Sequence, residues 1–309
     1  MSQPNATAHD VIEGSSLWAD AWKRWRKHRI SVASSVVLVL IIAGCLLGPT
    51  LVEALLGWTY EMQDIDLGAS APSLQHPFGT DVLGRDVLVR TMLGGRVSLA
   101  VALIATAVSL FVGVTYGAIS GFFGGRVDGV MMRIVDLMLS TPYLLLVIVL
   151  MAVIPPADLS VGGIDGSIIL MFGALGLVSW LILARIVRGQ VLALKEREFV
   201  EAARAIGVPP LTILFRHIVP NTLGPVIVYS TLTIPSVMLS EAFLSFLGLG
   251  IREPQASWGT LVNDGANAMV VYPWLLLFPG LTMTLTLFCL NFLGDGLRDA
   301  LDPSARTDG

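Results

Sequence analysis

Six long stretches without a single charged residue restrict what this 309-residue chain can fold into. A helix needs about 20 apolar residues to span the hydrocarbon core of a bilayer. In lipid the backbone must pair its own polar groups, which a helix does within one segment. The sequence therefore predicts an all-α integral membrane protein with six transmembrane helices. The charge-free stretches cover residues 30–52, 97–125, 137–157, 166–184, 217–240 and 265–294.

The composition agrees with this class and argues against several others. Charged residues make up 14% of the chain, whereas soluble domains carry about 25%. The net charge of −4 is too small to indicate nucleic-acid binding. The two cysteines, Cys45 and Cys289, both lie in apolar runs, so the sequence predicts no zinc cluster, no other metal site and no disulfide framework.

The basic residues predict the orientation of the chain. If the six helices alternate, fifteen of the 19 lysines and arginines fall on the side of the N-terminus and four on the other side. Loops that face the cytoplasm carry this excess. Both termini are therefore predicted to be cytoplasmic, and residues 57–96 to lie outside.

The same pattern divides the chain into five parts. Residues 1–29 are predicted to form a cytoplasmic tail and an interfacial helix, in which tryptophans alternate with lysines and arginines. The first transmembrane helix covers 30–56 and is followed by the outer segment 57–96. A core domain covers 97–303 and a short cytoplasmic tail 304–309. Within the core, the Gly- and Pro-containing residues 246–273 have the composition of a folded loop that either re-enters the membrane or caps a cavity.

The cytoplasmic segment 197–207 has the pattern of a short amphipathic helix. Gly207 stands where a helix often ends in the left-handed conformation. Pro209 and Pro210 prevent the helix from continuing, and either can begin the next one. Four apolar residues share one face at i, i+3, i+4 and i+7: Phe199, Ala202, Ala203 and Ile206.

This short helix has two interpretations. Ala202 and Ala203 keep it thin, so it can enter a groove on another protein, where Phe199 and Ile206 supply apolar contact. Glu201 and Arg204 can then pair with polar groups at the rim. The alternative is a loop that covers the ends of the chain's own helices. The pattern alone fits both.

Four blocks in the right order carry a resemblance to a known family, over about residues 20–303. Glu201-Ala202-Ala203, Gly207 and Ile218-Val219-Pro220 resemble the EAA signature of ABC-importer permeases, although His217 and Val219 replace its Ile and Leu. The other three blocks resemble the C-type subunits of dipeptide and oligopeptide permeases. They are His76–Asp86 with its continuation to Leu99, Glu241–Gly250 and Asn291–Pro303.

The resemblance implies a type I ABC-importer permease fold in the bacterial inner membrane. Such a chain forms half of a translocation pathway for di- or oligopeptides. Its implied partners are a B-type second permease subunit, two ATP-binding subunits or domains that bind ATP and Mg²⁺, an extracytoplasmic substrate-binding protein and membrane lipid. Closure of the ATP-binding subunits would move a coupling helix at about 197–207 as a rigid body. The implied coupling residues are Phe199, Glu201, Ala202, Ala203, Arg204, Ile206 and Gly207.

The sequence argues against an enzyme. A P-loop needs Lys directly after Gly, but the three lysines follow Trp22, Arg26 and Leu194. The chain is therefore expected to bind no cofactor and to leave ATP hydrolysis to its partners. Asp136 and Glu241 lie near the predicted membrane core, where charges often serve function; structural pairing and a substrate or proton role both stay open.

Two alternatives to a peptide importer are left open. Nickel and glutathione permeases resemble peptide permeases closely, and the binding protein largely selects the ligand. A secondary transporter or channel is the alternative from another class. It would not need the segment 201–220, and no row of intramembrane carboxylates for ion coupling is visible in the sequence.

The orientation is testable by labelling single cysteines in a variant that lacks Cys45 and Cys289. We expect a cysteine at Ser73 to react with a membrane-impermeant thiol reagent added outside intact cells, and a cysteine at Ser304 to be protected. The reverse pattern would contradict the predicted topology.

Overall fold

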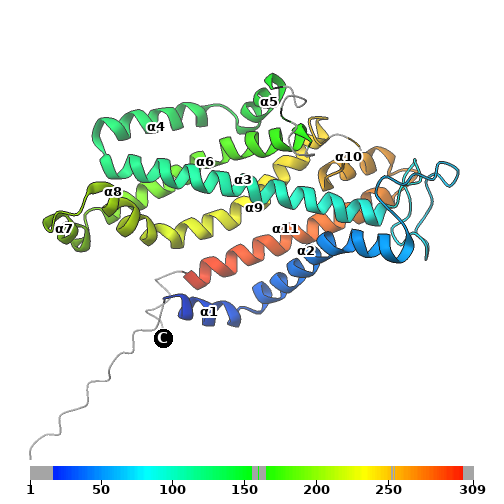
Figure 1. The fold of residues 1–309 in the computed structure, drawn as a ribbon, viewed down its shortest axis with the longest axis horizontal. Helices are drawn as coiled ribbons and strands as arrows, with labels where there is room; N and C mark the ends of the chain where they lie inside the picture. The colour runs from blue at the N-terminus through cyan, green and yellow to red at the C-terminus, as the bar shows by residue number, and fades with distance from the viewer. Residues whose placement is uncertain (1–16, 155–158, 160–164, 252, 254, 302–309) are drawn as a thin grey trace, which may run out of the picture.

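The chain forms a bundle of long helices in a computed structural model, which describes residues 17–301 apart from 155–158, 160–164, 252 and 254 (Figure 1). The helices are α1 Leu17–Lys27, α2 Arg29–Leu56, α3 Val87–Phe123, α4 Gly125–Ser140, α5 Tyr143–Val153, α6 Gly166–Leu194, α7 Glu198–Ala205, α8 Pro210–Thr212, the π-helix η2 Ile213–Ile218, the 3₁₀-helix η3 Val219–Thr222, α9 Leu223–Phe246, α10 Trp258–Ala268 and α11 Trp274–Leu301.

Among the described residues, five helices are long and apolar enough to cross a membrane, and α4 with α5 makes a sixth if this pair, bent by 88°, is one span. The beginning of α2 lies beside α11, because the Ser31 hydroxyl donates to the Phe292 carbonyl over 2.7 Å. The first and last long helices thus meet at one end, which an even number of crossings explains. The prediction of six spans is confirmed with the bent pair counted as one.

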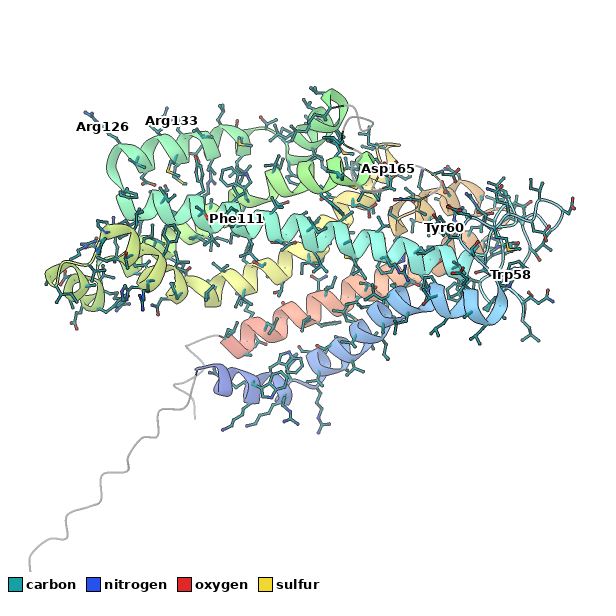
Figure 2. All side chains as sticks on the ribbon, in the orientation of Figure 1. Trp58, Tyr60, Phe111, Arg126, Arg133 and Asp165 are labelled. Carbon is teal, nitrogen blue, oxygen red and sulfur yellow. The ribbon has the colours of Figure 1, made fainter. Side chains whose placement is uncertain are left out.

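Two ends of the bundle are used as landmarks below (Figure 1). The α7 end carries α7, α8 and α1. The α10 end carries α10 and the segment between α2 and α3, in which Trp58 and Tyr60 are labelled in Figure 2.

The second long helix begins earlier than its charge-free stretch predicts. Residues 87–96, which the sequence assigns to the outer segment, form the first turns of α3. With 37 residues α3 is longer than the roughly 20 that a span needs, so its beginning can extend beyond the bilayer. Its arginines are accommodated by the fold: Arg90 pairs with Asp81, and Arg96 donates from Nε to the Cys45 carbonyl over 2.6 Å. Because both guanidinium groups have partners in the protein, these arginines are compatible with a continuous helix.

The third predicted helix, over 137–157, is broken. Its first part belongs to α4, and Thr141 and Pro142 are extended, with ψ of 136° and 125°. Proline has no N–H to donate, and its ring disfavours the helical conformation in the residue before it. Residues 155–157 of this prediction lie outside the described part of the chain.

A buried carboxylate ties α10 to the bundle. Glu241 of α9 is 1% exposed and accepts hydrogen bonds from the hydroxyls of Ser98, Ser245 and Ser257, over 3.0, 2.9 and 2.6 Å. Ser98 lies on α3, and its hydroxyl also accepts from the backbone N–H of Trp258, the first residue of α10. One carboxylate therefore connects α3, α9 and the N-terminus of α10.

Close contact between α3 and α6 is made possible by three glycines four residues apart. A Cβ atom at Gly117 would lie 2.3 Å from the Ala184 carbonyl oxygen, and one at Gly121 would lie 2.8 Å from the Arg188 carbonyl oxygen. Gly113 meets Leu183 and Trp180 in the same way, at 3.0 Å. Small residues at this spacing allow two membrane helices to approach backbone to backbone.

This contact predicts opposite effects for two Gly→Ala substitutions. Gly117→Ala should lower the thermal stability of the purified protein in detergent, because overpacking costs about 1–3 kcal/mol. Gly129→Ala on α4 is the matched control, since its Cβ would meet nothing within 4 Å. It should raise stability, because Ala is favoured over Gly in a helix by about 0.5–1 kcal/mol. Equal melting temperatures for the two variants would argue against close α3–α6 contact.

Candidate functional site

The segment predicted to couple to a partner protein forms α7 and a tight turn at one end of the bundle. Gly207 has φ of +80°, as the prediction of a left-handed residue requires. Its N–H donates to the Arg204 carbonyl over 3.0 Å, and the Val208 N–H donates to the Ala203 carbonyl over 3.1 Å. These two bonds make a Schellman motif, which pairs the last carbonyls of the helix. Pro210 then opens the next helix as its first residue.

Two residues fasten α7 to its own chain. Val200 is fully buried and Ala203 is 7% exposed. Both pack in a cluster with Ile213, Leu214 and Ile218 of the following π-helix. This cluster also contains Val187 and Val191 of α6. The position of α7 is therefore fixed by the helices on either side of it in the sequence.

Ala203 does not lie where its spacing predicts. It was expected to share an outward apolar face with Phe199, Ala202 and Ile206, but it faces the chain's own core. Val200, which was not among the candidate residues, is its buried partner. The signal that could have identified this pair is its i, i+3 spacing, which sets a second apolar edge beside the first.

The outer side of this segment combines apolar and charged residues. Phe199 is 41% exposed and Ile206 is 81% exposed. Glu201, Ala202 and Arg204 are exposed as well. Phe199 and Ile206 therefore leave apolar surface in contact with no other described residue, at an end of the molecule that is otherwise polar.

Two further exposed residues of the α7 end were missed by the sequence analysis. Leu211 and Phe215 are 56% and 46% exposed, and they lie four residues apart on the helix that follows the Pro209-Pro210 turn. They were read as part of a helix entering the membrane. With Phe199 and Ile206 they define the apolar α7 surface.

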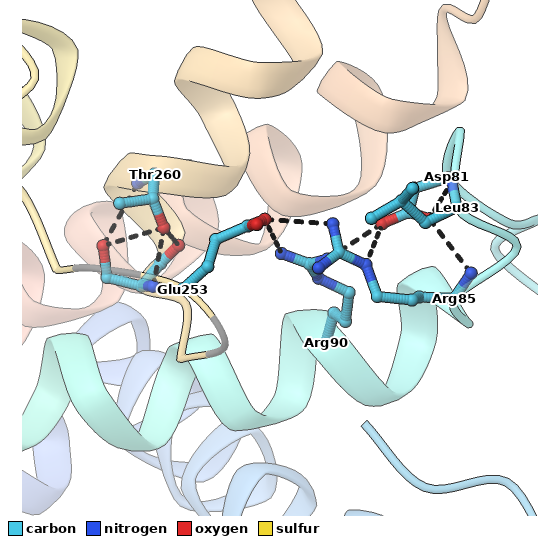
Figure 3. A network of polar contacts seen from close by, with 7 residues as sticks. Asp81, Leu83, Arg85, Arg90, Glu253 and Thr260 are labelled. Atoms are coloured by element: carbon cyan, nitrogen blue, oxygen red, sulfur yellow. Dashed lines mark hydrogen bonds and ion pairs between the residues drawn. The ribbon is translucent and has the colours of Figure 1, made fainter. Parts of the chain in front are cut away.

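The α10 end holds a network of ion pairs (Figure 3). Three of its residues come from the block that begins at His76 and continues to Leu99. Asp81 accepts from Nε of Arg85 over 2.7 Å and from a terminal nitrogen of Arg90 over 2.8 Å. Glu253 lies 3.1 Å from Arg85 and 3.8 Å from Arg90. The network joins the segment before α3, the beginning of α3 and the segment before α10.

Two further carboxyl groups, those of Asp86 and Asp264, lie at the same end of the bundle. Asp86 caps α3 by accepting from the Val89 N–H over 2.9 Å, and its other oxygen lies 2.8 Å from Nδ1 of His76. Burial raises the pKa of the Asp264 carboxyl on α10, and the nearby guanidinium of Arg90 opposes this effect. These contacts hold the α10 end together.

The two intramembrane carboxylates of the sequence analysis have protein partners. Asp136 forms an ion pair with Arg185, and Glu241 accepts from three hydroxyls. Both have the structural pairing that the sequence left open. Within the described part of the chain no group of three His, Cys, Asp or Glu side chains could hold a metal ion.

Comparison with known protein families finds two matches. Residues 113–307 match the family described as "Binding-protein-dependent transport system inner membrane component". Residues 16–77 match "N-terminal TM domain of oligopeptide transport permease C". The first match alone covers more than half of the chain.

Several curated proteins are similar along nearly the whole chain. The oligopeptide transport system permease protein OppC of Escherichia coli K12 is 50% identical over 297 residues, which are 96% of this chain and 94% of that protein. Its counterpart in Haemophilus influenzae is 48% identical over 297 residues, 96% and 91% of the two chains. The dipeptide transport system permease protein DppC of Bacillus subtilis is 42% identical over 306 residues, 98% and 91%.

A solved structure of the methionine ABC transporter MetNI, in inward-facing conformations, has a similar fold. The TM-score is 0.51 at 16% sequence identity, over 67% of this chain and 94% of that chain. At this identity the likeness concerns the fold alone.

The turn after α7 predicts a contrast between two replacements of Gly207. Gly207→Val should destabilise the end of α7 by about 1–3 kcal/mol, because a β-branched residue is strained at positive φ. Gly207→Asn should be tolerated, since Asn adopts this conformation readily and a Cβ here would meet nothing within 4 Å. Limited trypsin digestion at Arg197 and Arg204 measures the result: the Val variant should be cut faster than the Asn variant. Equal rates for both would show that the turn does not depend on φ.

Proposed function

The chain belongs to the family of binding-protein-dependent transport system inner membrane components, and from this we propose that it is the permease subunit of a peptide importer that is coupled to ATP hydrolysis through α7. It is a multi-pass protein of the bacterial inner membrane. The relatives described above are named as oligopeptide or dipeptide transport proteins. These names favour peptides over nickel or glutathione as the cargo of this chain.

The observation that carries the coupling proposal is the two-sided character of α7. Val200 and Ala203 seat the helix on its own chain, so it moves with α6 and the π-helix. Phe199 and Ile206 remain exposed for a partner. A helix that is fixed on one side and apolar on the other can transmit a movement of the partner to the membrane helices as a rigid body.

The chemistry of this surface suits a groove on ATP-binding subunits. Phe199 and Ile206 provide apolar contact that binding would remove from water. Glu201 and Arg204 are exposed beside them and can pair with polar groups of opposite charge. Because Ala203 faces inward, the docking contact is made by Phe199, Ala202 and Ile206 on α7, together with Leu211 and Phe215.

The remaining partners follow from the same proposal. A second, B-type permease subunit would complete the pathway as a heterodimer, and an extracytoplasmic binding protein would deliver the peptide. The excess of basic residues supports placing the α7 end in the cytoplasm, where ATP is available, and the α10 end outside. The chain itself has no Gly-Lys pair for a nucleotide site.

Ile206→Glu should weaken docking of the ATP-binding subunits by about tenfold or more, because a charge would enter an apolar contact without a partner. The side chain is 81% exposed, so folding and membrane insertion should be unchanged. Val270→Glu is the matched control: Val270 is 90% exposed and follows α10, at the opposite end of the bundle. Co-purification of the ATP-binding subunits from detergent measures docking. Retention of the ATP-binding subunits by the Ile206 variant at the control level would contradict the coupling role.

The function itself is tested by reconstitution in vesicles. Labelled oligopeptide should be taken up only when the second permease subunit, the ATP-binding subunits, the binding protein and ATP are all present. The purified chain alone should not hydrolyse ATP. Uptake by the chain alone, driven by an ion gradient, would instead indicate a secondary transporter.

A further inference from the structure

The break between α4 and α5 lies level with the middle of the long helices. Directly after it, the Tyr143 hydroxyl lies 3.3 Å from the Ser179 hydroxyl. Ser179 is near the centre of α6, which runs from Gly166 to Leu194. Half of α6 is about 21 Å long, so the break is remote from either end of that helix. It lies at the depth of the hydrocarbon core.

The two residues between α4 and α5 are not helical, and they are exposed. Thr141 and Pro142 have extended backbone and open side chains, and no described element covers them. The Thr141 N–H donates to the Met138 carbonyl over 3.3 Å, and the Pro142 carbonyl accepts from the Leu145 N–H over 2.9 Å, so these two groups stay paired. The break nevertheless interrupts the ladder between α4 and α5, and carbonyls at the end of a helix lack their helical partners. At membrane depth such a break is tolerated where it is covered by protein or lines a water-filled space, and not where it faces lipid.

Uncharged hydroxyl groups gather beside the break. The Tyr143 hydroxyl of α5 contacts the Ser179 hydroxyl of α6 and lies near the Ser240 hydroxyl of α9. On α9, Tyr229, Thr233, Ser236 and Ser240 recur at i, i+4, i+7 and i+11, so they form one stripe. We call the six residues the hydroxyl face: Tyr143, Ser179, Tyr229, Thr233, Ser236 and Ser240.

The hydroxyl face offers hydrogen-bond acceptors. Thr233, Ser236 and Ser240 each donate to the carbonyl four residues earlier, over 2.9, 3.3 and 2.9 Å. Their protons are thereby used, and their oxygens retain lone pairs. Ser236 is exposed. The other five residues of the hydroxyl face are partly exposed. The free lone pairs of this face and the break beside it are two separate observations, and water or a polar solute accommodates both better than lipid does.

We propose that the hydroxyl face and the break at Thr141-Pro142 line the passage through which the peptide crosses the membrane. This inference rests on the proposed function as a peptide importer. Peptides of different sequence share main-chain N–H groups, which hydroxyl oxygens accept. No charged residue belongs to the hydroxyl face, so it does not select one side-chain charge. Weak contacts at several points let a solute enter and also leave.

The test measures water access in the assembled transporter, with single cysteines in a background of Cys45→Ala and Cys289→Ala. The probes are Thr141→Cys and the near-isosteric Ser236→Cys. The control is Leu40→Cys near the middle of α2, where the side chain is 65% exposed on an apolar helix. We expect a small hydrophilic methanethiosulfonate to react with both probes at least tenfold faster than with the control. Modification at Ser236 should abolish peptide uptake.

The possible failures are distinguishable. If the cysteine-free complex takes up peptide but both probes react no faster than Leu40→Cys, the hydroxyl face is covered by lipid or by the second permease subunit. The inference is then wrong, and the proposed function stands. If the probes react quickly but modification leaves uptake unchanged, the face is wet without lying on the passage, which also overturns the inference. If the unmodified complex takes up no peptide, the proposed function fails instead.

Discussion

The close contact between α3 and α6 sets the position of the other elements. Lipid tails are as apolar as the side chains they surround, so burial of apolar surface does not hold membrane helices together; close packing does. Gly113, Gly117 and Gly121 remove the side chains that would separate the two backbones. Because α7 follows α6 directly and packs with Val187 and Val191, the α3–α6 contact also determines where α7 emerges.

Polar groups are distributed along the bundle in a way that fits transport. The α10 end is held by charge pairs, such as Asp81 with Arg85 and Arg90, and by Glu241 with its three hydroxyl donors. The middle carries neutral hydroxyls at Tyr143, Ser179 and along α9. Charged pairs hold neighbouring segments firmly in one geometry, whereas neutral hydroxyls make weaker contacts. A rigid α10 end and a middle that binds only weakly are compatible with a bundle through which a solute must pass.

Much of the fold could be predicted because single residues act locally. The absence of charge over about 20 residues indicates a span wherever it occurs. Gly207 and the Pro209-Pro210 pair determine backbone angles without help from distant contacts, and the structure has them as predicted. The exposure of Phe199 and Ile206 also agrees with the spacing of these residues. The role of this surface in coupling remains a prediction.

Sequence pattern is least informative where distant residues decide. Arg90 and Arg96 precede a charge-free stretch, and the helix already begins at Val87, because Asp81 pairs with Arg90 and the Cys45 carbonyl accepts a hydrogen bond from Arg96. Ala203 has the right spacing for the outer face, but Val200 and the cluster of Ile213, Leu214 and Ile218 place it inside.

The sequence by itself determined the class of the protein, most of its long helices and its family, since charge, hydropathy, Gly and Pro act within a few residues. The tertiary structure alone decided which face of α7 is free, where α3 begins and which hydroxyls meet at the break beside Tyr143. The physical reason is that each of these depends on partners far away in the sequence, such as Ser179 and Ser240 for Tyr143. Local pattern does not specify which of several apolar or polar faces such a partner will cover.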